Sequence, residues 1–413
     1  MSYTMNEASF DPECNPDDPK KVTYPDILRA AQNLENIVRR TPCERSWQMS
    51  QKCEMDLYFK KEYLQVTGSF KERGARYALS KLTAEHKRCG VIAASSGNHA
   101  LALSYHGQQM GIPVTVVMPV IAPLMKIQFC QSLGANVILE GETILQAKEF
   151  ALRHGAENNL KYINGYDAVD ILAGQGTMGC EILEQVPDVD AILVPVGGGG
   201  LLAGITVAVK TVKPTVKIYG IETEACPSFS EALKAGKPVK MKNRRSFADG
   251  LAVPTVGCNS LETAKHHVDK MILVNEESIA LSILRLMEVE KAVVEGGGAV
   301  GLAAILSNKV PELKGKRVVS ILSGGNIDTT VLGRSIERGL AVDGRLVRLE
   351  VVVSDRPGGI AELTTTLAHL GASIRDIFHD IKVNVVLETR GPEHVEEIKT
   401  VLKKQYVHVN FLF

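Results

Sequence analysis

Short apolar segments alternate along the chain with longer segments whose apolar residues recur every three to four positions. The short segments have the composition of buried strands, and the longer ones have the spacing of amphipathic helices. One series of such pairs covers residues 90–155, and a second covers 190–326. Repeated strand and helix pairs indicate βαβ units with parallel sheets. The pattern therefore predicts an α/β fold with two lobes.

The pattern changes after a turn at Asp343 and Gly344. From residue 346 the segments read strand, helix, strand, strand, helix, strand, which is the order of a ferredoxin-like unit. The link between its middle strands, within "DIFHDIKVNVV" at 376–386, is very short, and a register slip there would turn apolar faces outward. We predict a disordered polar arm (1–22), a large lobe (23–64 and 168–340), a small lobe (65–167) and a C-terminal unit (345–413).

Composition places the chain among ordinary globular proteins. Of its 413 residues 45% are hydrophobic, and 47 basic side chains balance 47 acidic ones. Net charge therefore gives no reason to expect binding to nucleic acid or to an anionic membrane. The eight cysteines lack paired spacing, so we expect reduced thiols and a cytoplasmic location. The N-terminal residues have no apolar core typical of a leader, and no apolar run approaches the roughly 18 residues of a membrane span.

Candidate chemistry lies in three turns that follow predicted strands. They are "SSGNHA" at 95–100, "GGGGLLAG" at 197–204 and "LSGGN" at 322–326. The carboxyl ends of parallel strands converge on one crevice, and a glycine-rich turn before a helix exposes N–H groups to an anion. The tetraglycine could also be a tight packing turn. A fourth stretch, "TGSFKERGA" at 67–75, sets Lys71 between two glycines.

Together, and in this order, these four stretches resemble the fold-type II pyridoxal-phosphate enzymes, specifically the threonine dehydratase and serine racemase family. The resemblance covers about residues 24–335. The stretch "VSDRPGGIAELTTTLAHLGASI" at 353–374 resembles ACT-type regulatory domains. The resemblance implies a two-lobed fold-type II enzyme with a C-terminal ACT-like domain, and pyridoxal phosphate as cofactor.

The resemblance also implies roles for individual residues. Lys71 would form the Schiff base with the cofactor and move the α-proton of the substrate, which requires an amine with a depressed pKa. The other cofactor residues would be Phe70 near the ring, Asn98 on the ring hydroxyl, Gly197, Gly198, Gly199 and Gly200 around the phosphate, and Ser323 at the pyridine nitrogen. The substrate carboxylate would bind near Ser95, Ser96, Asn98 and His99; His99 could instead be a packing residue.

The implied activity is dehydration of L-threonine and L-serine to a 2-oxo acid and ammonia. Ser96 supports an alternative, a serine or aspartate racemase in which Lys71 and Ser96 act on opposite faces of the substrate. Ser96 could also cap the following helix, and Gln146 stands where the racemases carry a carboxylate-binding arginine. A third alternative is a non-catalytic amino-acid sensor.

The family resemblance extends to a cation site and to the assembly. Glu222, Cys226 and Ser228 lie where the racemases bind a divalent cation; here the cation could also be monovalent, and the alternative is a surface carboxylate. The short hairpin weakens the expectation that "SDRPGG" at 354–359 binds an amino-acid effector. The expected assembly is a homodimer, or a homotetramer through the ACT-like units, with no nucleic-acid or membrane partner.

Overall fold

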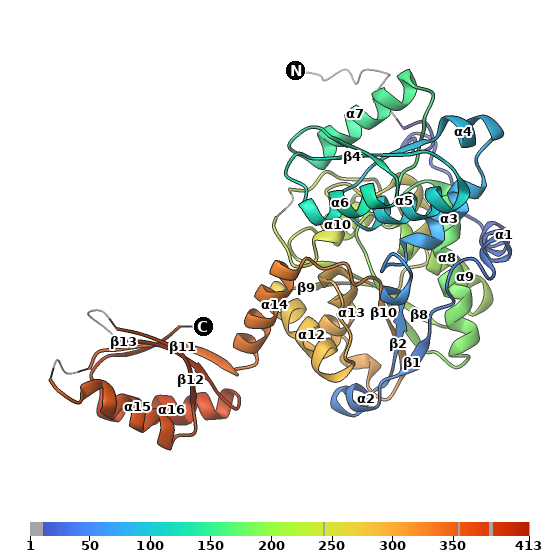
Figure 1. Ribbon diagram of the computed structural model, residues 1–413. Coiled ribbons are helices and arrows are strands. Elements are labelled where there is room, and N and C mark those ends of the chain that lie inside the picture. The colour runs from blue at the N-terminus through green and yellow to red at the C-terminus, as the bar shows by residue number, and fades with distance from the viewer. Residues whose placement is uncertain (1–10, 243, 354–355, 380–382, 413) are drawn as a thin grey trace.

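The computed structural model describes residues 11–242, 244–353, 356–379 and 383–412. The described chain forms a two-lobed body and a smaller C-terminal unit that is joined to it through α14 (Thr329–Val342) (Figure 1). Three separate sheets organise these parts. No helix in the described ranges is long and apolar enough to cross a membrane.

The large lobe is built on a six-stranded sheet with the order β1-β2-β10-β7-β8-β9. All neighbouring strands are parallel except β1, which is antiparallel to β2. The strands are β1 (Cys43–Arg45), β2 (Asp56–Lys61), β7 (Ala191–Pro195), β8 (Lys217–Thr223), β9 (Lys270–Val274) and β10 (Arg317–Leu322). Its helices are α1 (Tyr24–Leu34), α2 (Trp47–Cys53), α8 (Val169–Gln185), α9 (Gly200–Val212), α10 (Ser228–Ala235), α11 (Cys258–Ala264), α12 (Glu276–Val289), α13 (Gly296–Leu306) and α14.

The strands of this sheet are buried on both faces. Along β7, Ile192 and Val194 pack into a core with α1, α8 and α9, whereas Ala191 and Leu193 pack into a second core with α2, α12 and α13. Successive side chains of a strand point to opposite faces, so a strand covered on both sides is apolar throughout. This explains why "AILVP" reads as a continuous apolar run.

The small lobe contains a four-stranded parallel sheet with the order β5-β4-β3-β6. Its strands are β3 (Val91–Ala94), β4 (Val114–Met118), β5 (Asn136–Leu139) and β6 (Lys161–Tyr162), and its helices are α3 (Lys71–Ser80), α4 (Ala84–Cys89), α5 (Asn98–Met110), α6 (Leu124–Ser132) and α7 (Ile144–Glu157). Helix α3 joins the lobes: Ala75 and Ala78 belong to the small-lobe core, and Tyr77 belongs to the large-lobe core. The predicted fold class, with two parallel sheets flanked by helices, is confirmed.

The C-terminal unit is an antiparallel sheet with the order β12-β13-β11-β14, covered by two helices, as a ferredoxin-like ACT domain would be. Its elements are β11 (Leu346–Val351), α15 (Gly359–His369), β12 (Ser373–His379), β13 (Val383–Glu388), α16 (Pro392–Gln405) and β14 (Val409–Leu412). Val383, Val385 and Leu387 of β13 are all buried, so this strand keeps its apolar face inward. Its pairing with β12, however, shifts register between Ile374 and Asp376, and Ile377 and Phe378 of β12 are exposed. The turn at 380–382 and Ser354 and Asp355 of "SDRPGG" lie outside the described residues.

Ion pairs hold the joint between the body and the C-terminal unit. Arg285 on α12 pairs with Asp343, and Arg345 pairs with Glu288. Between them, Gly344 has φ +66° and lets the chain turn from α14 into β11. The joint is therefore a specific contact rather than a loose tether.

The N-terminal segment corrects one expectation. We expected residues 1–22 to be disordered, but the described residues 11–22 pack on the body. The side chain of Asn164 donates to Asp11, and the main chain of Lys20 donates to Asn259 at 2.7 Å. Polar composition suggested a solvated arm; these polar groups instead have partners far along the chain.

Candidate active site

Lys71 lies at the first position of α3, where the "TGSFK" and "LSGGN" stretches are joined by main-chain hydrogen bonds. Phe70 N donates to Ser323 O at 3.0 Å, and Gly325 N donates to Gly68 O at 2.9 Å. The fold therefore brings together Lys71 and Ser323, which are 252 positions apart in the numbering, through their neighbouring backbone. This convergence is the one expected from the carboxyl ends of parallel strands.

Lys71 is partly buried, and its Nζ donates a hydrogen bond to the main-chain carbonyl of Gly165. Burial lowers the pKa of Lys71 to about 8, although the nearby Glu295 carboxylate acts in the opposite direction. Nζ lies 5.2 Å from the centre of the Phe70 ring. Near neutral pH a useful fraction of this amine is unprotonated, as a nucleophile and general base requires.

The tetraglycine connects β7 to α9 and has the properties of a phosphate cradle. Gly199, with φ +97°, is the N-cap of the 13-residue helix α9, and within the described chain no side chain caps this end. The first-turn N–H groups of the helix are therefore free to bind an anion. A Cβ at Gly198 would lie 2.3 Å from the Tyr166 ring, and one at Gly200 would lie 2.5 Å from the Tyr166 carbonyl oxygen. The turn can carry only glycine, and it fits the phosphate of pyridoxal phosphate.

Asn98 connects the small lobe to two turns of the large lobe. Its Nδ2 donates to Glu295 Oε1 at 2.7 Å, and its Oδ1 accepts a hydrogen bond of 2.7 Å from Asn326 Nδ2. These two hydrogen bonds hold the Asn98 side chain in place, as a residue that binds the ring hydroxyl of the cofactor would require. Gly324 leaves room for this contact, because a Cβ there would lie 2.5 Å from Glu295 Oε1.

Ser95 and Ser96 lie between β3 and α5, and neither caps the helix. The N-cap of α5 is Gly97, and the structure shows no side-chain cap among the described residues. Ser95 Oγ accepts a hydrogen bond from Gly97 N at 3.3 Å. The capping alternative for Ser96 is therefore wrong, which leaves its hydroxyl for a ligand.

The ring of His99 is held by the protein at one nitrogen, Nε2, whereas Nδ1 is buried and has no partner among the described residues. Nε2 lies 3.1 Å from the Ile163 carbonyl, an acceptor, so Nε2 carries the proton. Burial, together with the nearby Lys71, lowers the pKa of His99 to about 3, so the ring is neutral. With its N–H used, the ring cannot donate to a carboxylate; only the main-chain N–H in the first turn of α5 can. The ring also packs against Gly165, since a Cβ there would lie 2.5 Å from it, and the substrate role of His99 stays a sequence-based prediction.

Glu222 is buried at the end of β8 and caps α10. It accepts hydrogen bonds from Phe229 N at 2.7 Å, Ser230 N at 3.0 Å and Ser230 Oγ at 2.6 Å. The thiol of Cys226 donates to the carbonyl of Val253 at 3.5 Å. The alternative of a surface carboxylate is wrong. No group of three or more His, Cys, Asp or Glu side chains in the described ranges is arranged for a metal, so the cation at Glu222, Cys226 and Ser228 stays a sequence-based prediction.

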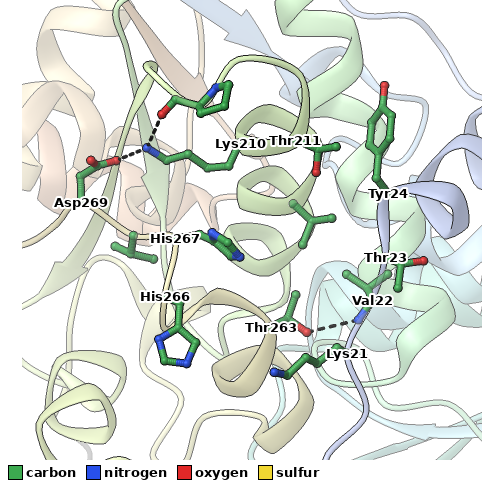
Figure 2. A pocket seen from close by; sticks show the side chains of 13 residues that line it. Lys21, Val22, Thr23, Tyr24, Lys210, Thr211, Thr263, His266, His267 and Asp269 are labelled. Carbon is green, nitrogen blue, oxygen red and sulfur yellow. Dashed lines mark hydrogen bonds and ion pairs between the residues drawn. The ribbon is translucent and has the colours of Figure 1, made fainter.

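Two further features lie outside this site. Gln146 is exposed and accepts hydrogen bonds from Glu142 N and Thr143 N as part of a capping box at α7. Figure 2 shows a pocket of about 600 Å³ that is lined by none of the predicted site residues. Its lysines are neutralised, Lys21 by Glu262 at 2.9 Å and Lys210 by Asp269 at 2.6 Å, so it does not attract an anion strongly.

Sequence reasoning missed Glu295 and Gly165, and it included Asn326 in the "LSGGN" turn without giving it a role. A glutamate before "GGGAVGLAAIL" looks like an exposed helix cap, and Glu295 is indeed the N-cap of α13. A signal was present, however. Helix α13 is apolar on all sides, as a fully buried helix is, so the charged residue at its start was a candidate for a partly buried position.

Comparison with known proteins agrees with this geometry. Residues 34–324 match the family model described as pyridoxal-phosphate dependent enzyme. The L-threonine ammonia-lyase of Thermotoga maritima is 44% identical over 391 residues, which cover 92% of this chain and 97% of that protein. The 8% left unmatched is too short to contain all of residues 345–413, so the similarity extends into the C-terminal unit.

Two solved structures extend the comparison. The processed form of threonine deaminase isoform 2 from Solanum lycopersicum has a TM-score of 0.73 and 33% identity, over 78% of this chain and 95% of that chain. Serine racemase from Dictyostelium discoideum has a TM-score of 0.70 and 35% identity, over 74% of this chain and 99% of that chain. A partly buried lysine, a glycine-rich turn and a match over most of the body thus agree, and the chain belongs to the pyridoxal-phosphate dependent enzyme family.

Proposed function

We propose that this protein is an L-threonine and L-serine ammonia-lyase that releases a 2-oxo acid and ammonia. The observation that carries the proposal is the partly buried Lys71, whose pKa is lowered to about 8, at the point where the glycine-rich turns converge. A relative at 44% identity with a match over 92% of this chain, named L-threonine ammonia-lyase, supports the substrate class. A non-catalytic sensor would not need an amine tuned in this way.

Several groups of the chain would hold the cofactor. The N–H groups at Gly197, Gly198, Gly199 and Gly200 would bind its phosphate, Asn98 its ring hydroxyl and Ser323 its pyridine nitrogen, with Phe70 beside the ring. When bound, pyridoxal phosphate supplies an electron sink for the pair of electrons left at Cα. Ser323 offers a hydroxyl rather than a carboxylate, so it does not hold the ring nitrogen protonated, which favours loss of a β-substituent.

Lys71 is the group that moves the proton. Its unprotonated amine takes the α-proton, and the substrate β-hydroxyl leaves as water. The released enamine is hydrolysed to the 2-oxo acid and ammonia. The Gly165 carbonyl, which accepts from Lys71 Nζ, holds the amine in a defined position while it is free.

The substrate carboxylate would bind at the start of α5. The helix presents uncapped N–H groups there, and the hydroxyls of Ser95 and Ser96 lie beside them. The ring of His99 contributes indirectly, because it holds the Ile163 carbonyl and packs against Gly165. Binding of the substrate carboxylate would thus depend on main-chain N–H groups of α5 that no described side chain caps.

The test is incubation of the cofactor-loaded protein with L-threonine, L-serine and L-aspartate in separate samples, with 2-oxo acid release and product chirality followed together. Release of 2-oxo acid from L-threonine and L-serine, lost in Lys71→Ala, is the expected result. A wild-type protein that binds the cofactor but releases no 2-oxo acid from any of the three would overturn the proposal.

Racemisation is a second candidate activity, because Ser96 does not cap α5 and a serine racemase is among the similar structures. A second acid or base opposite Lys71 is what racemisation requires. Ser96→Ala should then abolish formation of the D-isomer while L-serine elimination continues. Equal loss of both activities would contradict a separate role for Ser96.

We further propose that the chain forms a homodimer, or a homotetramer through the C-terminal units, and that it works in the cytoplasm. Exposed apolar side chains on the outer strand β12, among them Phe378 at 65% exposure, support association through that unit. Eight free thiols support a reducing compartment.

A further inference from the structure

Glu295 ends a directed chain of hydrogen bonds that begins next to Lys71. The Thr67 carbonyl accepts from Asn326 Nδ2 at 2.7 Å, the same nitrogen donates to Asn98 Oδ1 at 2.7 Å, and Asn98 Nδ2 donates to Glu295 Oε1 at 2.7 Å. A carbonyl oxygen can only accept, so the Thr67 carbonyl fixes which end of the Asn326 amide faces it. Each later step of the chain is then fixed in turn.

This direction determines which way the Asn98 amide faces. Its oxygen is used by Asn326, so its nitrogen must meet an acceptor, and Glu295 is that acceptor. One N–H of Asn98 is used in this contact, and the second has no partner among the residues that the structure describes. Without Glu295 the amide would lose the group that holds its nitrogen on this side.

We propose that Glu295 is a positioning residue that orients the Asn98 amide so that its second N–H is kept for the ring hydroxyl of the cofactor. The inference rests on the proposed function, in which Asn98 is the partner of that hydroxyl. Glu295 itself acts through Asn98. Gly324 is part of the same arrangement, because any side chain there would displace both Glu295 and Asn98.

The surroundings of Glu295 agree with this role. Burial, with Asp249 nearby, raises the pKa of Glu295 to about 7, while Asn98 and Lys126 act in the opposite direction. Lys71, on α3, also interacts electrostatically with the Glu295 carboxylate. Removing a carboxylate partly from water is costly, and α13 could have begun with an uncharged cap. A carboxyl oxygen of Glu295 can accept the hydrogen bond from Asn98 whether the carboxyl group is protonated or not. The orientation of the Asn98 amide should therefore not change with pH.

The experiment compares the visible absorption of the cofactor-loaded protein, titrated with pH, in wild type, Glu295→Ala, Glu295→Gln and Asn98→Ala. Loss of the hydrogen bond should move the midpoint of the Glu295→Ala titration by about one pH unit and lower kcat on L-threonine about tenfold. Glutamine keeps an acceptor oxygen, so Glu295→Gln should stay within about threefold of the wild-type kcat. Glu276→Gln is the matched control, since that carboxylate supports Ser246 and Phe247.

A double variant separates positioning from general damage. If Glu295 acts through Asn98, adding Glu295→Ala to Asn98→Ala should change the titration no further. The proposal would be overturned if Glu295→Ala titrated like wild type, or if Glu295→Ala shifted the midpoint further in a protein that already carries Asn98→Ala. It would also be overturned if Glu295→Gln were as impaired as Glu295→Ala. If Glu295→Ala does not fold, Asn326→Ala tests the same chain from its other end and should shift the midpoint in the same direction.

The readout also separates this inference from the proposed function. The titration requires bound cofactor but no amino acid. Absence of 2-oxo acid from the wild type would overturn the ammonia-lyase activity alone, and the titration would still decide the role of Glu295.

Discussion

The ring of Tyr166 lies directly on Gly198, so that a Cβ at position 198 would be 2.3 Å from it. The same residue touches Gly200 through its carbonyl oxygen, and the preceding Gly165 carbonyl accepts from Lys71. The phosphate cradle and the lysine are therefore connected by one loop. A substitution in the glycine turn should therefore affect both this turn and the position of Lys71.

Gly198→Ala should weaken cofactor binding about tenfold or more, because the new methyl must displace Tyr166 and the turn that it contacts. The affinity can be measured by titrating the apoprotein with pyridoxal phosphate and following absorption. Gly333→Ala is the control: a Cβ on that helical residue meets nothing within 4 Å, and affinity should not change. Equal affinities in all three proteins would contradict the packing argument.

The rate at which the cofactor attaches to Lys71 should rise with pH and level off above pH 8. Burial lowers the pKa of this amine from 10.5 to about 8, and only the unprotonated amine is a nucleophile. Stopped-flow absorption of apoprotein mixed with pyridoxal phosphate at a series of pH values gives the profile. A rate that keeps rising beyond pH 10 would show a lysine with an ordinary pKa.

Arg73→Met should lower the free energy of unfolding by about 3–5 kcal/mol, since it leaves a buried carboxylate without its partner. Arg73 pairs with Glu62 at 2.7 Å and with Glu181 at 2.6 Å, and its side chain is 2% exposed. Urea unfolding followed by far-UV circular dichroism gives the value. The exposed pair of Arg338 and Glu277 provides the contrast, because Arg338→Met should cost less than about 1 kcal/mol. Similar losses in both variants would contradict a special role for the buried network.

Glu222→Gln should lower the stability by about 1 kcal/mol, because one acceptor oxygen replaces the two that receive hydrogen bonds from Phe229 and Ser230. The same pair of proteins tests the sequence-based cation. Mg²⁺ or K⁺, added to protein in sodium buffer with chelator removed, should raise the melting temperature of wild type and not of the variant. An equal response of both proteins would place the cation elsewhere.

Phe378→Lys should reduce the assembly to a smaller oligomer if the C-terminal units associate through β12. A charge on this exposed outer strand disfavours pairing with a second copy. Light scattering during gel filtration measures the mass of the assembly. Leu28→Lys, on an exposed face of α1, is the control, and a mass unchanged by Phe378→Lys would exclude β12 as the contact.

Much of this molecule followed from the sequence. Alternating strand and helix patterns predicted both parallel sheets, and the order of segments after Gly344 predicted the ferredoxin-like unit, because local periodicity reports which face of each element is buried. The glycine-rich turns could be placed together as well, since parallel strands present their carboxyl ends at one edge. The tetraglycine and the turn that holds Ser323 were found in this way, whereas the roles expected of Lys71 and Ser323 followed from the family resemblance.

What the sequence did not reveal depends on contacts between distant segments. Whether Ser96 caps a helix and whether Glu222 lies at the surface were decided by the fold, since Gly97 is the N-cap of α5 and Glu222 accepts from Ser230. The fold also showed that the Ile163 carbonyl holds one ring nitrogen of His99. A side chain has the same local pattern whether its hydrogen-bonding groups are free or used. Only packing determines which of these occurs.

Glu295 is the clearest case of this limit. Its carboxylate meets Asn98, 197 positions earlier in the chain, and nothing in the local pattern around either residue indicates the other. The sequence by itself determined the elements, their order and the lysine that we propose carries the chemistry. The tertiary structure alone decided the orientation of the polar groups around that lysine, because hydrogen-bond direction depends on which donors and acceptors the folded chain brings within reach.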